Sequence, residues 1–297
     1  MSTGVESRQA DIVGLAPAKR PWKQVIWTAA VLLVLAIFLA TFYKQNFVGL
    51  TDRHSLDVAQ IARNVASGNG FTTHFLRPFN VALAGDQSLQ NRELNTAPAF
   101  PYAVAAVFRL RSPSDQCVAW VSMLFLLLTI GGTYLLGRLL FDWRVGLMSA
   151  AVLGTSASVL ETAASGTEWT MAGFVLVTVL VLIALHHRST IREGGAAGVV
   201  YPAACGILLA LMYMTAHMLL FLAIPLAVYF GVTGKRRRFH LAVFVLVVIL
   251  SAAPWGYRNV VCTHGSVLGA NAWDIMSHST AFPGDTLYRS TDGDNLS

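Results

Sequence analysis

Long apolar runs recur along the whole chain and are separated by short polar stretches. A helix needs roughly 17 to 25 apolar residues to cross a hydrocarbon core about 30 Å thick. Inside such a core every backbone N–H and C=O group must find its partner within the segment, so each run is expected to be helical. The runs predict an all-α, polytopic transmembrane bundle of about seven spans, near residues 25–43, 118–140, 145–162, 170–186, 198–214, 217–233 and 240–257.

The composition agrees with residence in a membrane. Hydrophobic residues make up 55% of the 297 residues and charged residues only 12%, whereas soluble domains carry roughly a quarter charged residues. The net charge is +6, but Lys and Arg cluster between the apolar runs and form no basic stripe with aromatics, so no nucleic-acid partner is expected. Cys117, Cys205 and Cys262 lack the spacing of a zinc site or a disulfide framework.

The basic residues also predict the orientation of the bundle. With seven spans, the clusters before the first span and in three short connections all fall on one side, which the positive-inside rule identifies as cytoplasmic. We therefore expect a multi-pass protein of the cytoplasmic or inner membrane. Its parts would be a disordered cytoplasmic arm at 1–24, a transmembrane domain at 25–258 and an extracytoplasmic C-terminal tail at 259–297. Truncation of the chain within this tail is left open. The three connecting clusters are Arg138 with Arg144, Arg188 with Arg192, and residues 235–238.

The large first loop, 44–117, is expected on the extracytoplasmic side and contains two amphipathic segments. Apolar residues recur at helical spacing over 55–66, which predicts a helix lying along the membrane surface. His54 or Ser55 is suited to cap its start, and Gly68 and Gly70 are suited to end it. A second interfacial helix is expected over 98–108, because two prolines lie in its first turn and the segment is too short to span.

Four stretches resemble, in order, those of a known superfamily. The run LDVAQIARNVASGNGFTTHFLRP, followed by APAFPYAVAAVFRL, is similar to the first extracytoplasmic loop of the GT-C superfamily. These are polytopic glycosyltransferases related to protein O-mannosyltransferases and bacterial lipid A aminoarabinose transferases. The later stretches ASGTEWTMAGFVLVTVLVLIAL, GILLALMYMTAHMLLFLAIPLAV and APWGYRNVVCTHGSVLGAN resemble the family's fourth-span entry, its following pair of spans and the exit from its seventh span.

The resemblance implies transfer of a sugar from a polyprenyl-phosphate-linked donor to an acceptor on the extracytoplasmic face, with inversion at the anomeric carbon. It implies no cofactor and leaves a divalent cation open. The family's general base is a carboxylate in the first loop. Asp57 is the preferred candidate because it lies on the helix that matches the family. Asp52 and His54 are the alternatives, since His54 stands where relatives have the acidic residue.

The resemblance also implies substrate-binding residues. Arg63, Arg77 and Arg258 are expected on the side of the first loop, where a guanidinium can stabilise the leaving phosphate. Glu168 takes the place of the family's acidic residue at the fourth-span entry. His217 follows Thr215 and Ala216, where relatives carry an arginine.

The implied partners are the lipid-linked donor, membrane lipid and a lipid, glycan or protein acceptor. A non-catalytic or truncated GT-C-like membrane subunit is the alternative. A transporter is less favoured, because the ionisable residues lie in loops or at span ends and no internal repeat is visible.

Overall fold

The computed structural model describes residues 22–74, 92–94, 96–192 and 198–263. Within these ranges every regular element is a helix, and pairing of extended chain is limited to a single bridge between Thr72 and Arg92. The predicted all-α class is therefore confirmed for the described part of the chain.

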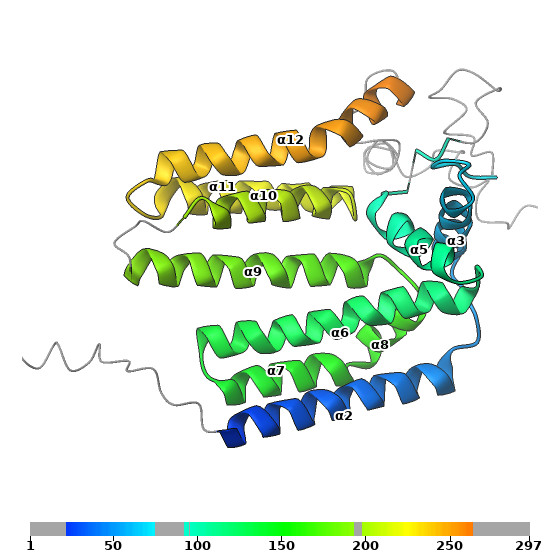
Figure 1. Cartoon of the computed structure of the whole chain (residues 1–297), viewed down its shortest axis with the longest axis horizontal. Helices are drawn as coiled ribbons and strands as arrows, with labels where there is room; N and C mark the ends of the chain where they lie inside the picture. Colours follow the sequence, from blue (N-terminus) through cyan, green and yellow to red (C-terminus); the bar gives the residue numbers. More distant parts are fainter. Residues whose placement is uncertain (1–21, 75–91, 95, 193–197, 264–297) are drawn as a thin grey trace, which may run out of the picture.

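The described helices run back and forth along one direction and form a layered bundle (Figure 1). Each apolar run of the sequence corresponds to one pass, and two of the passes consist of two consecutive helices. The elements of the passes, in chain order, are α2 (Trp22–Asn46), α6 (Asp115–Leu140), α7 (Trp143–Thr155) with α8 (Ala157–Ala164), α9 (Trp169–Arg192), α10 (Val200–Tyr213), η1 (His217–Leu222) with α11 (Ala223–Val232), and α12 (Arg237–Thr263).

The helices differ in their capacity to cross a membrane. Four of the described helices, α2, α6, α9 and α12, are long and apolar enough to do so, and the pair α7 and α8 adds a fifth if its 58° bend lies within one span. The helix α10 has only 14 residues, about 21 Å of rise. A 3-10 turn precedes α11, which has 10 residues. The structure thus shows four or five candidate spans, and the number seven stays a prediction.

Two further helices, α3 (Arg53–Ala66) and α5 (Ala99–Leu110), lie at one end of the bundle rather than along it (Figure 1). Both predicted first-loop helices are therefore present at nearly the expected bounds. Positive φ angles at Gly68 (84°) and Gly70 (75°) turn the chain after α3, a conformation that glycine adopts without steric cost.

The predicted cap of α3 was wrong. The side chain of Asp52 caps the helix by accepting a hydrogen bond from the backbone N–H of Ser55, so α3 begins at Arg53.

An apolar cluster fixes α3 and α5 to the bundle. The side chains of Ile61 on α3, Phe100 and Val104 on α5, and Val118 on α6 have no exposed surface. Burying a side chain of this size stabilises the fold by about 1.5–3 kcal/mol each. The backbone N–H of Ala99 also donates to the carbonyl of Met214, 2.8 Å away, at the end of α10. The end of the bundle is thus a packed layer and not a loose loop.

The basic connections gather at the opposite end of the bundle. The α6–α7 connection, the end of α9 and the α11–α12 connection all lie there, together with the start of α2 (Figure 1). Arg188 of α9 donates a hydrogen bond to the carbonyl of Leu139 at the end of α6. The common location of these clusters agrees with the positive-inside reasoning.

Two glycines allow α6 and α7 to pack backbone against backbone. A Cβ atom added at Gly137 would lie 2.8 Å from the Cα of Gly146, and one added at Gly146 would lie 2.6 Å from the carbonyl oxygen of Tyr134. Neither neighbour can move as a flexible side chain would. Close contact through small residues is a common way for helices to associate in lipid.

We predict that Gly137→Ala destabilises the bundle by about 1–3 kcal/mol through overpacking. Gly131→Ala, on the same helix, is the control, because a Cβ at Gly131 meets nothing within 4 Å. Thermal unfolding in detergent should show a lower midpoint for Gly137→Ala and no loss for Gly131→Ala. Equal midpoints for the two variants would contradict the proposed backbone contact.

Candidate functional site

A histidine and a glutamate from distant parts of the chain meet at the capped end of the bundle. His54 Nε2 lies 2.7 Å from Glu168 Oε2. His54 belongs to the first turn of α3, and Glu168 immediately precedes α9. The His54 side chain is 41% exposed and that of Glu168 16% exposed. The imidazole of the pair is therefore accessible from outside the protein, whereas the carboxylate is largely buried.

Glu168 raises the pKa of His54 above its ordinary value of 6.5. The hydrogen bond to Glu168 is the largest cause, and partial burial opposes it. The negative charges of Glu168, Asp52 and Asp57 add to the increase. An anionic environment of this kind favours the imidazolium form.

The pair has the geometry of a general base with its orienting partner. An ionised carboxylate only accepts hydrogen bonds, so His54 Nε2 carries the proton when the ring is neutral. The lone pair of the neutral ring is then on Nδ1. A base held by a second polar group is the arrangement expected for proton transfer from a hydroxyl.

Asp57, the preferred base of the sequence analysis, and Asp52, an alternative, have different positions. Asp52 Oδ2 accepts from both the backbone N–H (3.1 Å) and the hydroxyl (3.3 Å) of Ser55, which gives it a capping role in α3. Asp57 is half-buried on α3, one turn beyond His54, and contributes charge to the histidine. The structure leaves the chemical role of both carboxylates as a prediction.

A second group surrounds Arg258 near the end of α12. The guanidinium lies 4.4 Å from the ring centroid of Trp255 and 5.4 Å from that of Phe71. It donates a 2.8 Å hydrogen bond to the carbonyl of Glu93. Both a cation–π contact and a charge-assisted hydrogen bond hold this arginine, so Arg258 connects α12 to the first loop.

Buried polar residues continue this arginine group toward α10. The Glu93 side chain is fully buried and accepts from the backbone N–H of Thr96 at 2.9 Å. Asn259 Nδ2 lies 3.4 Å from the hydroxyl of Tyr213. The Tyr213 ring makes an edge contact with the buried His217, with centroids 5.2 Å apart. His217 is thus adjacent to the arginine group.

Among the described residues, neither Arg63 nor Arg258 contacts His54. Arg63 lies nine residues along α3, about 13 Å by helical rise and on the opposite helix face. Arg258 contacts the ring of Phe71. The next residue, Thr72, accepts a hydrogen bond through its carbonyl from Asn64, which lies near the end of α3 opposite to His54. Arg77 lies outside the described residues. The imidazole–carboxylate pair and the arginine group are therefore two separate groups.

The sequence reasoning missed several members of these groups. It did not pair His54 with Glu168, because 114 residues separate them and no local pattern connects them. Glu93 carried no signal at all, whereas Trp255 and Asn259 lay within the quoted APWGYRN stretch. Among the described residues no three His, Cys, Asp or Glu side chains gather to hold a metal ion, and the need for a divalent cation stays open.

The position of Asp52 predicts a stability effect. Asp52→Ala should destabilise the start of α3 by about 1 kcal/mol, because the cap is lost, while Asp52→Asn keeps an acceptor and should have a small effect. Thermal unfolding and hydrogen exchange of the α3 amides measure the difference. If Asp52→Ala and Asp52→Asn unfold at the same temperature as wild type, the capping account is wrong.

Comparison with known proteins relates the site to a family. A model of the dolichyl-phosphate-mannose-protein mannosyltransferase family matches residues 95–257. This range includes Glu168 and His217, begins after α3 and ends next to Arg258. No curated protein matches the sequence.

A solved structure shares the fold. The crystal structure of the Archaeoglobus fulgidus oligosaccharyltransferase in the apo form superposes with a TM-score of 0.60 at 16% sequence identity. The alignment covers 85% of this chain and 33% of that one, so the chain spans about a third of the archaeal protein. Because the family model matches more than half of the residues, the chain belongs to the dolichyl-phosphate-mannose-protein mannosyltransferase family of GT-C membrane proteins.

Proposed function

We propose that the protein is a membrane glycosyltransferase that moves a sugar from a polyprenyl-phosphate-linked donor to an acceptor hydroxyl on the extracytoplasmic face. Membership of a family whose name specifies a dolichyl-phosphate-mannose donor supports the class of reaction. The observation that carries the proposal is the 2.7 Å contact between His54 and Glu168. This contact supports His54 as a base that Glu168 orients, at the end of the bundle where α3 lies.

In the proposed reaction, His54 takes the proton of the acceptor hydroxyl through Nδ1. The hydroxyl oxygen forms a bond to the anomeric carbon as the bond from that carbon to the donor phosphate breaks. The bonding electron pair leaves with the phosphate, which departs from the opposite face, so the configuration inverts. Glu168 stabilises the imidazolium that forms, as an orienting carboxylate does in other His-dependent sites.

His54 replaces Asp57 as the preferred base in this proposal. A base needs both a basic lone pair and a fixed direction, and the described contacts give His54 a direction through Glu168. Asp57 remains the second candidate, since it lies one turn away on the same helix. The predicted phosphate contacts of Arg63 and Arg258 remain predictions, because both lie away from His54 in this arrangement.

The separation of the arginines from His54 favours one second candidate function. A non-catalytic GT-C-like membrane subunit would keep the fold and the packed end while needing no cation beside the histidine. Substitution of the proposed base distinguishes the two functions. It should strongly reduce sugar transfer by an enzyme, whereas a non-catalytic subunit has no base whose loss would affect transfer.

We predict that His54→Gln lowers the rate of sugar transfer by about 10²–10⁴-fold, the typical contribution of a general base. Radiolabelled mannosyl phosphopolyprenol in membranes that contain the expressed protein provides the measurement. His74→Gln, an exposed histidine of the same loop, is the matched control and should keep wild-type activity. Full activity of His54→Gln together with loss in Asp57→Asn would transfer the base role to Asp57, and full activity of both would favour the non-catalytic subunit.

The pH dependence provides a separate prediction. A base is active when neutral, and the pKa of His54 is raised, so activity should rise with pH through a value above 6.5. Glu168→Gln keeps a hydrogen-bond acceptor but removes the negative charge. Because that charge stabilises the imidazolium, its loss should lower the pKa of His54. The acidic limb of the rate profile should therefore move to lower pH. A limb that stays in place, or moves to higher pH, contradicts the pair as the titrating base.

The orientation is proposed from the basic clusters and is tested by labelling. A cysteine at Ser112, beside α5, should react with a membrane-impermeant thiol reagent in intact cells, and one at Lys235 should not. Cys262→Ser removes the partly exposed native thiol. The reverse labelling pattern would place the His54–Glu168 pair on the cytoplasmic side and overturn the proposed face of the reaction.

A further inference from the structure

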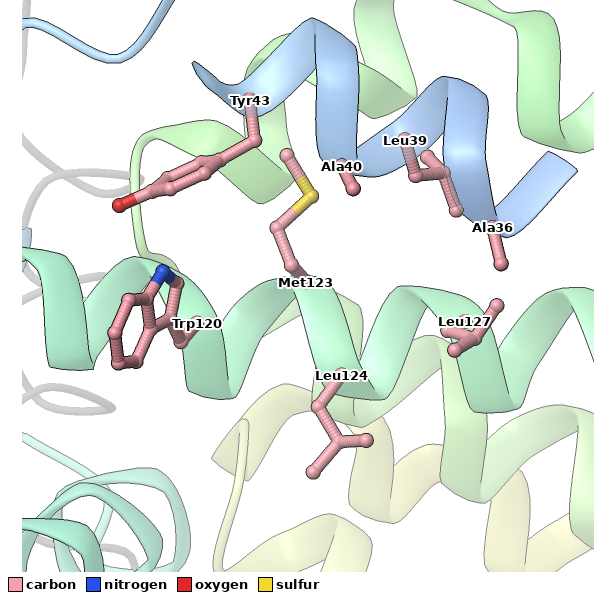
Figure 2. A pocket seen from close by; sticks show the side chains of 8 residues that line it. All are labelled: Ala36, Leu39, Ala40, Tyr43, Trp120, Met123, Leu124 and Leu127. Carbon is pink, nitrogen blue, oxygen red and sulfur yellow. The ribbon is translucent and has the colours of Figure 1, made fainter.

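A groove of about 340 Å³ lies between α2 and α6, apart from both polar groups described above. Ala36 and Ala40 of α2 have small side chains that leave room for the groove, and Leu127 of α6 is another of its lining residues. Figure 2 shows Ala36 and Leu127 at one end of the groove and Tyr43 and Trp120 at the other. The volume is within the range of small-ligand pockets, about 300–1,000 Å³.

The two ends of the groove differ in polarity. The part near Ala36 is lined by aliphatic side chains alone. The other end contains the Tyr43 hydroxyl, and the indole of Trp120 is the polar neighbour of that hydroxyl. Met123 extends from α6 toward α2 between the two ends (Figure 2). Tyr and Trp are enriched where hydrocarbon meets headgroups. The groove therefore runs from the expected membrane interface into the hydrocarbon layer.

A cation lies at the polar end. The guanidinium of Arg111 stands 5.1 Å from the ring centroid of Trp120, the residue that lines the groove. Lys44 lies in the last turn of α2, one residue after Tyr43. Asp115 begins α6 at this end and is the opposing charge. Arg111 does not line the groove itself, but its contact with Trp120 brings an exposed guanidinium next to the polar end. A guanidinium beside an apolar groove is complementary to a phosphate attached to a hydrocarbon chain.

We propose that this groove binds an anionic phospholipid of the surrounding bilayer, with one acyl chain between α2 and α6 and the phosphate at Arg111. The bound lipid packs α2 against the bundle, since α2 buries little of its own surface against other helices. A phospholipid is favoured over a sugar-bearing carrier because the groove has no carboxylate or amide side chain among its lining residues to recognise sugar hydroxyls. This inference is independent of the proposed transfer reaction.

Native mass spectrometry of the purified full-length chain tests the proposal. The probes are phosphatidylglycerol and phosphatidylcholine with identical acyl chains, and a short polyprenyl phosphate. Wild type should retain one phosphatidylglycerol with about fivefold preference over phosphatidylcholine, the effect of roughly one cation near an anionic headgroup. Arg111→Gln should remove this preference. Arg53→Gln, an equal change of charge at an exposed position of α3, should keep it.

Groove-filling variants test the position of the chain. Ala36→Phe and Ala40→Phe occupy the groove and should lower retention of phosphatidylglycerol about tenfold or more, because the acyl chain loses its buried contacts. Ala30→Phe, at an exposed position of the same helix outside the groove, should bind like wild type. An unfolding midpoint close to that of wild type shows that a variant is folded.

Two results would overturn the proposal. Undiminished retention in both groove-filling variants would place the lipid elsewhere on the protein. Displacement of phosphatidylglycerol by polyprenyl phosphate at equal concentration would identify the occupant as the isoprenoid carrier rather than a bilayer phospholipid.

Discussion

The apolar contact between the first-loop helices and the bundle end is the interaction on which the rest of the structure depends. Ile61, Phe100, Val104 and Val118 are fully buried there. Burial of apolar surface drives this packing without directional bonds, so it can hold two helices across the ends of others. His54 reaches Glu168 only because α3 is held in this way. The same packing of α3 and α5 holds Phe71 in contact with Arg258.

Much of the fold could be predicted from the sequence, because hydrocarbon restricts the backbone so strongly. Each apolar run became a helical pass, and the period of the 55–66 segment matched α3 nearly to the residue. The cap could not be assigned in the same way, since His54, Ser55 and Asp52 all precede the apolar pattern and only the backbone geometry selects one. The number of membrane spans also depends on short helices such as α10. Their length alone does not determine whether they cross the membrane.

The candidate site could be predicted only in part. The sequence singled out His54, Glu168 and Arg258 individually. The hydrogen bonds from His54 to Glu168 and from Arg258 to Glu93, however, join segments more than 100 residues apart. A pattern of local spacing contains no information about such contacts. The sequence analysis expected Arg63 and Arg258 on the side of the first loop, but spacing along the chain gives no distance between them and His54. In the structure α3 has 14 residues, about 21 Å, and it keeps His54 and the Arg258 group apart.

The central claim is that His54 and Glu168 act as one unit, and a double-mutant cycle on the sugar-transfer rate tests it most directly. Initial rates would be compared for wild type, His54→Gln, Glu168→Gln and the double variant. If Glu168 acts through His54, the double variant should be no slower than His54→Gln, within about twofold. Losses that multiply across the two single variants would show that the residues act independently and would contradict the account.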